Sequence, residues 1–183
     1  MSRTSVVSII ALLAGAASPG LAQYKLTTLA NVYGGTSLTV VGSTLYGADG
    51  GGGANGDGMV FSLPITGGAP TILASFNGNN GDIPNASLVV SGRTLYGTTQ
   101  NGGASVYGTV FSLPITGGAP TVLASFNEYN GASPNGPMVL SGGTLYGTST
   151  NGGVYGGGAV FSVPVTGGTP TVLASFDGSS GRR

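Results

Sequence analysis

The chain has 183 residues, of which five are basic and five acidic, so its formal net charge is zero. Without a basic excess it lacks the electrostatic footprint of a nucleic-acid-binding protein. It contains no cysteine, histidine or tryptophan, which excludes disulfides, thiolate metal sites, cysteine nucleophiles and imidazole acid–base chemistry.

The N-terminus has the pattern of a secretory signal peptide. Arg3 gives a basic start, an apolar run covers 6–17, and small residues precede a cleavage point after Ala22. The alternative is a membrane anchor, but the run of 12 residues is shorter than the roughly 20 needed to span a bilayer. We therefore expect a signal peptide at 1–22 and a secreted, extracellular or cell-surface mature chain at 23–183 without a membrane span.

The mature chain repeats itself every 50 residues. The tripeptide Leu-Tyr-Gly at 45–47 returns at 95–97 and 145–147, and the run 60–76 returns at 110–126 with one change. Such a period indicates stacked copies of one supersecondary unit. The predicted order is an extra strand at 26–30, which resembles the last strand of a copy, then repeats at 31–76, 77–126 and 127–176, and a tail at 177–183.

Each copy is predicted to be a four-stranded antiparallel meander. In the second copy the strands cover 87–91, 94–98, 109–115 and 120–126. Gly92 begins a two-residue link and suits a primed hairpin turn, in which φ is positive. The prolines that recur in the third strand cannot donate to a ladder, so we expect them at a bulge or a free edge. They are Pro64, Pro114 and Pro164.

The third and fourth strands carry the apolar pattern of each copy. Side chains of the third strand alternate between its two faces, so that Phe111 and Val110 lie on opposite faces. This period-two pattern indicates a half-buried strand. In the fourth strand, simple alternation places Val122, Ala124 and Phe126 on one face.

Radial stacking of such meanders gives a β-propeller, and the period is close to that of kelch blades. The predicted fold is all-β, a β-propeller-like array of three four-stranded antiparallel blades in an incomplete or open ring. An open β-solenoid or meander stack is the alternative. Because closed rings need about four blades or more, the chain is either a truncated member or a homo-oligomer by strand exchange. In the latter, two copies would form a six-bladed ring and exchange the strand 26–30.

Four stretches of the second copy carry a family resemblance: Leu-Tyr-Gly-Thr-Thr at 95–99, Asn-Gly-Gly at 101–103, Gly-Thr-Val-Phe-Ser-Leu at 108–113 and Leu-Ala-Ser-Phe-Asn at 123–127. They resemble the Gloeo/Verruco (GloVer) tandem repeat of bacterial choice-of-anchor tandem repeat proteins. The resemblance covers nearly the whole mature chain. It implies an exported, propeller-like protein without an assigned enzyme activity. The resemblance therefore implies no catalytic residues in this sequence. Such proteins usually have more copies and a terminal anchoring signal, and this sequence shows neither.

The acidic residues do not recur at equivalent positions of the copies, which is typical of solvated loop residues. They are Asp49, Asp57, Asp82, Glu128 and Asp177. A glycosidase pair needs two carboxylates held across a substrate, so we predict no catalytic residue and no enzyme activity. The loop 49–58 could wrap Ca²⁺ but lacks the EF-hand spacing, and a flexible turn is favoured. We expect no metal and no cofactor.

The aromatic residues divide into repeated and non-equivalent positions. The repeated phenylalanines are expected in the core between blades, and the repeated tyrosines at a blade rim, where a ring of them could bind sugars. Four non-equivalent tyrosines fall in variable segments, where a binding surface is more plausibly built. These candidate ligand-binding residues are Tyr33, Tyr107, Tyr129 and Tyr155.

Three functions remain open. The first is a secreted, non-catalytic module that binds an unknown extracellular protein or glycan, but no nucleic acid. The second is a structural surface or matrix repeat without a discrete ligand. The third, more remote, is a propeller enzyme acting on extracellular glycans. Saturable binding to a glycan array would separate the first two.

Overall fold

The computed structural model describes residues 6–14, 24–33 and 37–179, with side chains from residue 37 onward. Within these residues every regular element is a β-strand. The described chain begins with an antiparallel hairpin of β1 (Val6–Ala14) and β2 (Tyr24–Tyr33), which forms a two-stranded sheet of its own. The predicted extra strand 26–30 lies within β2, and β1 covers much of the apolar run. Signal cleavage stays a prediction.

Three repeat sheets follow, each an antiparallel meander. The first contains β3 (Leu38–Val41), β4 (Thr44–Asp49), β5 (Met59–Pro64) and β6 (Thr71–Ser75). The second contains β7 (Val89–Ser91), β8 (Thr94–Thr99), β9 (Thr109–Pro114) and β10 (Thr121–Ser125). The third contains β12 (Val139–Ser141), β13 (Thr144–Asn151), β14 (Ala159–Pro164) and β15 (Thr171–Ser175), and a short fifth strand β11 (Ala132–Pro134) pairs with β13.

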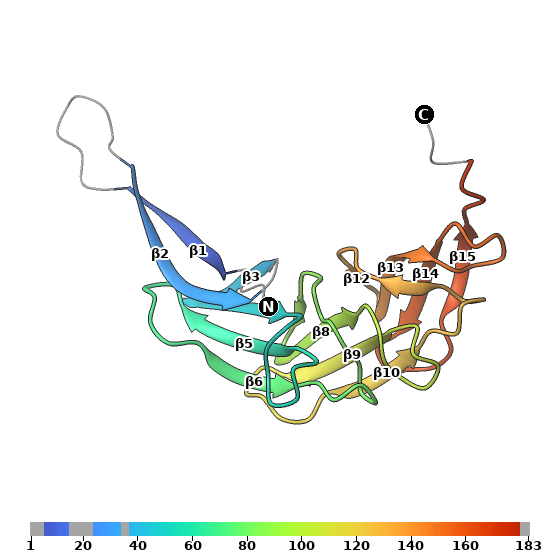
Figure 1. Cartoon of the computed structure of the whole chain (residues 1–183), viewed down its shortest axis with the longest axis horizontal. Helices are drawn as coiled ribbons and strands as arrows, with labels where there is room; N and C mark the ends of the chain where they lie inside the picture. Colours follow the sequence, from blue (N-terminus) through green and yellow to red (C-terminus); the bar gives the residue numbers. More distant parts are fainter. Residues whose placement is uncertain (1–5, 15–23, 34–36, 180–183) are drawn as a thin grey trace, which may run out of the picture.

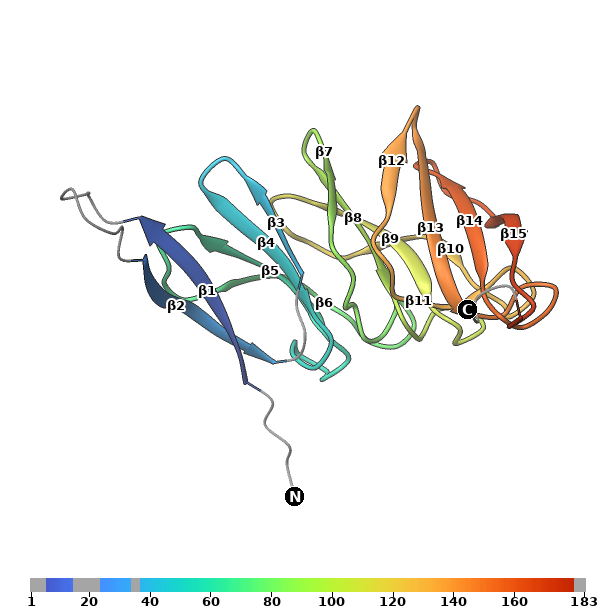
Figure 2. The same ribbon diagram turned by 90° about the horizontal axis from the view of Figure 1, so that it is seen from above.

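The three repeat sheets stand side by side in an open arc (Figure 1). β3 and β12 lie toward the concave side of the arc, and β6, β10 and β15 lie toward its convex side. The hairpin β1–β2 stands at one end and β15 at the other, and the turned view separates the successive sheets clearly (Figure 2). The predicted all-β array of blade-like sheets in an open ring is confirmed.

The two-residue turns between the first and second strands have the predicted backbone. Gly42 and Gly92 both have φ of 58°, and Gly142 has φ of 56°. The third-strand prolines lie at the end of their strands. Pro64 is paired with Thr44 of β4, whereas the ladder between β5 and β6 ends two residues earlier, at Ser62. The missing N–H therefore costs no ladder hydrogen bond.

The hydrophobic core lies between the sheets rather than inside any one of them. Phe76 of the first repeat meets Phe111 of the second edge to face, with ring centroids 5.0 Å apart. Phe126 and Phe161 repeat this contact at the next junction, at 4.8 Å. All four rings are fully buried. Such pairs contribute about 0.5–1.5 kcal/mol beyond the area they bury, so each junction is held by the same aromatic contact.

Two details of the strand pattern differ from the sequence-based expectation. Val110 and Phe111 are both fully buried, so β9 is not half-buried, because neighbouring sheets cover both of its faces. The fourth strand does not place Val122, Ala124 and Phe126 on one face. Val122 pairs with Phe111 and Ala124 with Val110, which leaves Leu123 as a β-bulge between them. The bulge turns Val122 to the opposite face.

The bulge also connects neighbouring sheets through the backbone. In the first sheet Leu73 is the bulged residue, between Ile72 and Ala74. Its carbonyl accepts a hydrogen bond of 2.9 Å from the amide of Gly118, in the hairpin between β9 and β10. The carbonyl of Leu123 accepts the same bond from Gly168, also at 2.9 Å. Each junction therefore combines an aromatic pair with a backbone hydrogen bond.

Candidate binding surface on the loop rim

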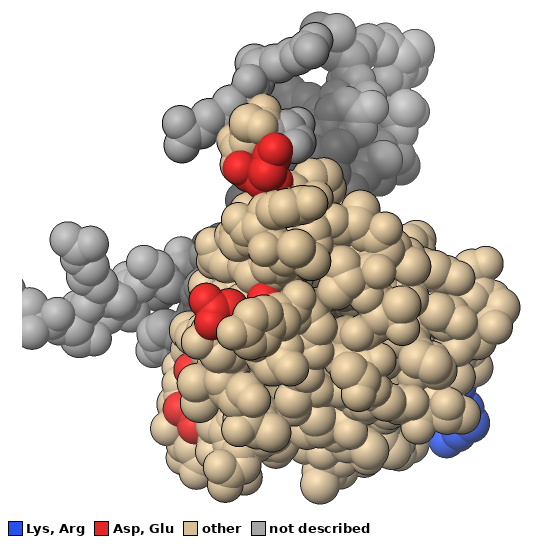
Figure 3. All heavy atoms as spheres, turned by 90° about the vertical axis from the view of Figure 1, so that its right-hand side faces the viewer, with Lys and Arg blue, Asp and Glu red and all other residues tan. Residues whose placement is uncertain are grey.

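The meander topology separates short turns from long loops. The hairpin turns between first and second and between third and fourth strands lie at one rim of the sheets. The other rim, called the loop rim below, carries the loops 50–58, 100–108 and 152–158 and the connections 76–88 and 126–138. Seen from the β15 end, acidic side chains gather along one side of the molecule, and the basic atoms drawn lie on the opposite side (Figure 3). Copy-specific residues concentrate on the loop rim.

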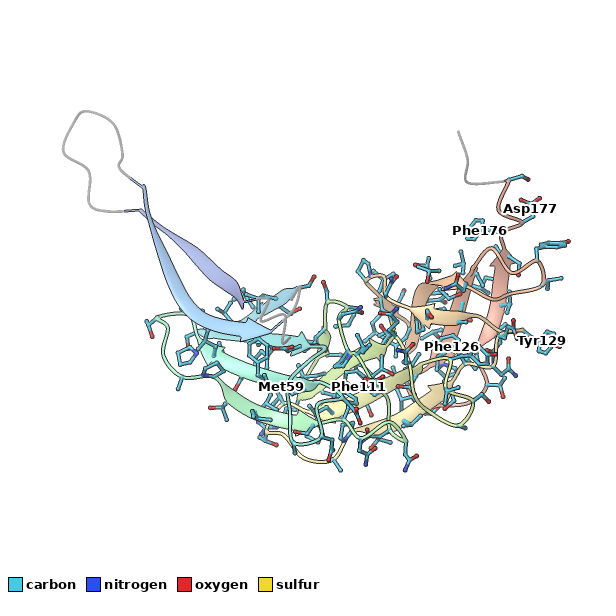
Figure 4. The ribbon with its side chains drawn as sticks, viewed as in Figure 1. Met59, Phe111, Phe126, Tyr129, Phe176 and Asp177 are labelled. Carbon is cyan, nitrogen blue, oxygen red and sulfur yellow. The ribbon has the colours of Figure 1, made fainter. Side chains whose placement is uncertain are left out.

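Two of the predicted ligand-binding tyrosines lie close together on this rim. The hydroxyl of Tyr107, in the loop 100–108, donates to Oε2 of Glu128 at 3.4 Å. The backbone carbonyl of Tyr107 accepts a 2.9 Å hydrogen bond from the amide of Ser133. Tyr129 follows Glu128 directly and is 79% exposed. Figure 4 shows Tyr129 at the margin of the arc, with its ring directed away from the sheets. The junction between the second and third sheets therefore presents a phenol–carboxylate pair beside an exposed ring.

The backbone around this pair is left-handed, as it is at the equivalent positions of the repeat, but here it carries side chains. Val106 has φ of 61° and Glu128 has φ of 68°, in the left-handed region that side chains with a Cβ rarely adopt. Glycine occupies the equivalent positions one period away in each direction: Gly56 and Gly156 correspond to Val106, and Gly78 and Gly178 correspond to Glu128. Left-handed backbone at a non-glycine residue costs about 1–3 kcal/mol and clusters at functional sites. Val106 of the second copy and Glu128 of the third thus place side chains at positions where glycine would fit better.

We call the four residues Val106, Tyr107, Glu128 and Tyr129 the rim patch. Val106 is 70% exposed, so the patch presents apolar, aromatic and anionic groups together. Sequence reasoning found the two tyrosines but missed Val106 and Glu128 as members. The signal was present, because each replaces a glycine that the other copies share.

The other candidate tyrosines lie elsewhere. Tyr155 is exposed in the next loop, 152–158. Tyr33 ends β2, and its side chain lies outside the described residues. Among the repeated tyrosines, Tyr46 is buried in the core cluster of the first junction, and Tyr96 packs against the cluster of the second. Tyr96 and Tyr146 are half-buried, so the three repeated tyrosines are not equally accessible.

The interpretation of the carboxylates as solvated loop residues is wrong for Asp49. Asp49 is fully buried, and its Oδ1 accepts a 2.9 Å hydrogen bond from the amide of Gly51. The equivalent Thr99 and Ser149 are also buried, and each accepts a 3.1 Å hydrogen bond from the backbone across the loop. All three side chains therefore accept a hydrogen bond from a backbone amide, although the bond to Asp49 comes from two residues along the chain and those to Thr99 and Ser149 from ten.

Among the described residues, no three His, Cys, Asp or Glu side chains come together in a group that could hold a metal ion. No helix that could cross a membrane occurs in the described part of the chain.

The fold and its junctions define a β-propeller-like tandem repeat protein. The family model of the Gloeobacter/Verrucomicrobia repeat matches residues 8–183, and the chain belongs to this family. A comparison with curated proteins gives no match.

Among solved structures, the chain is similar to a putative TolB from Agrobacterium tumefaciens, at 17% identity and a TM-score of 0.49. The match covers 74% of this chain and 43% of that protein, so this chain spans less than half of its length.

Proposed function

We propose that this repeat protein is a secreted, non-catalytic module that binds an extracellular glycan or protein through the rim patch. The observation that carries the proposal is the pairing of Tyr107 with Glu128 across two loops, in which Glu128 and Val106, the neighbour of Tyr107, have a left-handed backbone that favours glycine. The contacts that hold neighbouring sheets together are the same at both junctions and do not involve these side chains. Their retention at a cost in backbone strain supports a role in binding.

The chemistry of the rim patch suits a neutral, hydroxyl-rich ligand. An exposed ring such as that of Tyr129 offers an apolar face with a polar tip, and aromatic residues are enriched at the centres of binding surfaces. The carboxylate of Glu128 can accept hydrogen bonds from ligand hydroxyls in addition to the one from Tyr107. A glycan meets both demands, and a protein loop rich in serine, threonine or tyrosine is the alternative.

The absence of catalysis is part of the proposal. The carboxylate of Glu128 is engaged by a phenol, and that of Asp49 is buried in a turn. Neither arrangement resembles an acid and a base held across a substrate. Assays with model glycosides should therefore give no turnover.

The binding proposal is tested by changing the rim patch to the residues of the other copies. A variant with Val106→Gly, Glu128→Gly and Tyr129→Asn introduces the residues found one period earlier, Gly56, Gly78 and Asn79, and should fold at least as well as the parent. On a glycan array and a panel of extracellular proteins, the parent should show a saturable ligand that this variant loses. Tyr155→Ser, which restores the residue of the second copy, is the matched control and should retain binding. Saturable binding that survives the triple substitution would place the site elsewhere.

A structural surface or matrix role is the second candidate. The observation that favours it is the equivalence of the two junctions, which suits a scaffold. In that case no saturable ligand would be found for the parent.

Export is tested separately. Expression in a Gram-negative host should yield a chain whose N-terminal residue is Gln23, measured by mass spectrometry of the material outside the inner membrane. An uncleaved N-terminus in all fractions would contradict the signal peptide.

A further inference from the structure

The outward face of the third repeat sheet repeats the residues that are buried at the two junctions, yet it is exposed. Phe176 is 38% exposed and Leu173 is 53% exposed, whereas Phe76 and Phe126 are fully buried. Ala174 is exposed as well, in contrast to its buried counterparts in the first two copies. Figure 4 places Phe176 at the free end of the arc. We call Val160, Leu173, Ala174 and Phe176 the outer face.

The chain also contains the complementary half of such a junction. In the second sheet, Leu95, Phe111 and Leu113 receive the face of the preceding sheet. Their equivalents in the first sheet form a separate hydrophobic cluster, in which no residue of another repeat sheet takes part. The cluster consists of Leu45, Phe61 and Leu63, with Leu38 and Met59 packed against it. We call it the receiving face.

We infer that the outer face of one copy docks on the receiving face of a second copy of this chain. The contact continues the two internal junctions: Phe176 takes the place of Phe76 and Phe126 and meets Phe61 edge to face. The carbonyl of the bulge residue Leu173 accepts a hydrogen bond from Gly68, the counterpart of Gly118 and Gly168. A second copy is the occupant because both halves of the junction are present in one sequence, in the same sheet geometry.

The hairpin β1–β2 stands beside the receiving face and must give way (Figure 2). It is a separate two-stranded sheet, and β2 is paired with β1 rather than with β3 in the described residues. A two-stranded hairpin is marginally stable by itself, whereas a four-stranded sheet brings a larger apolar face. Phe61 and Leu63 are fully buried while the hairpin is present, so docking of a partner's third sheet requires its displacement. The signal cleavage proposed above would remove β1 and so separate β2 from its partner strand. Few charges bear on the contact, since only 10 of 183 residues are charged.

The resulting contact is head to tail. Such a contact joins two different surfaces and closes into a ring where the rotation permits it. The sheets of one chain follow one another along an arc (Figure 1), and a contact that continues this arc would lead towards a closed ring. This association is independent of the rim patch and goes beyond the binding function.

Cross-linking of the full chain distinguishes this contact from the alternatives. The sequence has no cysteine, so single cysteines can be introduced cleanly. At the internal junctions, Gly118 touches Leu73, which places its neighbour Ala119 beside the bulge. The corresponding pair across two copies is Leu173 and Ala69. With a short bismaleimide, a mixture of the L173C and A69C chains should give a cross-linked dimer of the two different chains.

Neither single variant alone should cross-link to itself. Dimers of L173C with itself would show that two outer faces meet, and the inference would then be wrong. No cross-link in any combination would also overturn it.

Light scattering coupled to size exclusion gives the second test. The parent should have a molar mass that corresponds to two or more chains, and this mass should fall on dilution. Phe176→Asp should shift the apparent dissociation constant upward by at least tenfold and give monomer. Val139→Asp, at a 67% exposed position on β12, is the control and should leave association unchanged. A parent that is monomeric at every concentration tested contradicts the inference, whatever the rim patch binds.

Discussion

The ring of Phe111 lies directly over Gly97, its cross-strand partner between β8 and β9. A Cβ atom at Gly97 would lie 2.5 Å from Cζ of Phe111, a distance that real Cβ contacts do not reach. Gly47 and Gly147 have the same relationship to Phe61 and Phe161, both at 2.6 Å. The glycine of the recurrent Leu-Tyr-Gly motif thus leaves the space that the phenylalanine ring occupies.

Gly97→Ala should destabilise the protein by about 1–3 kcal/mol, because the added methyl group forces the buried Phe111 ring out of place. Urea denaturation monitored by tyrosine fluorescence or circular dichroism measures the change. Gly92→Asn is the control: that position has φ of 58° with open space around it, and asparagine tolerates this conformation. Equal losses for the two variants would refute the steric argument.

Phe126→Ala should cost about 3–5 kcal/mol, because it empties a fully buried site and removes the edge contact with Phe161. Phe176→Ala changes the same repeat position on the exposed outer face and should cost clearly less. The comparison requires a protein concentration at which the chain is monomeric. Similar midpoints for both variants would mean that the outer face is already covered within one chain.

Thr99→Val should destabilise by about 1–3 kcal/mol, since it leaves buried groups without their partner. The Thr99 hydroxyl lies 2.8 Å from that of Thr109, donates to the carbonyl of Asn101, and accepts from the Thr109 amide. Thr99→Ser follows the residue at the equivalent position in the third copy, Ser149, and should be nearly neutral. Thermal unfolding of both variants tests this, and a neutral Thr99→Val would show that the network contributes little.

Salt should change the stability little, because charged residues make up only 5% of the chain. The melting temperature in sodium chloride at low and at high ionic strength should agree to within a few degrees. Chloride is preferred for this comparison because sulfate and phosphate strengthen apolar burial by a different route. A large dependence on chloride would reveal a charge network that the structure does not show.

The sequence was sufficient to predict the strand order, the turns at Gly92 and its equivalents, and the stacking of the copies, because all of these follow from local pattern and a fixed period. It was insufficient to predict which face of a strand each side chain lies on and whether that face is buried. The bulge at Leu123 breaks the alternation on which the placement of Val122 depended, and nothing in the apolar pattern marks it. To predict that Val110 and Phe111 are both buried, one would have to know that neighbouring sheets cover both faces of the second sheet.

The rim patch illustrates the same division. Tyr107 and Tyr129 stood out as non-equivalent aromatics, but their connection through Glu128 depends on how two loops from successive copies meet. Asp49 was assigned to solvent because its carboxylate is unique, whereas it is buried like Thr99 and Ser149 and, like them, accepts a hydrogen bond from a backbone amide. Chemical equivalence between different residue types is invisible to position-by-position comparison.

The hydrogen bond between the Leu73 carbonyl and the Gly118 amide has a consequence for how such a protein can grow. Because the bond joins main-chain atoms and recurs unchanged one copy later, a tandem duplication of the coding segment would insert a competent unit without compensating mutations. The number of copies can therefore change during evolution, while the side chains of the loops between the strands can be substituted without disturbing the junctions.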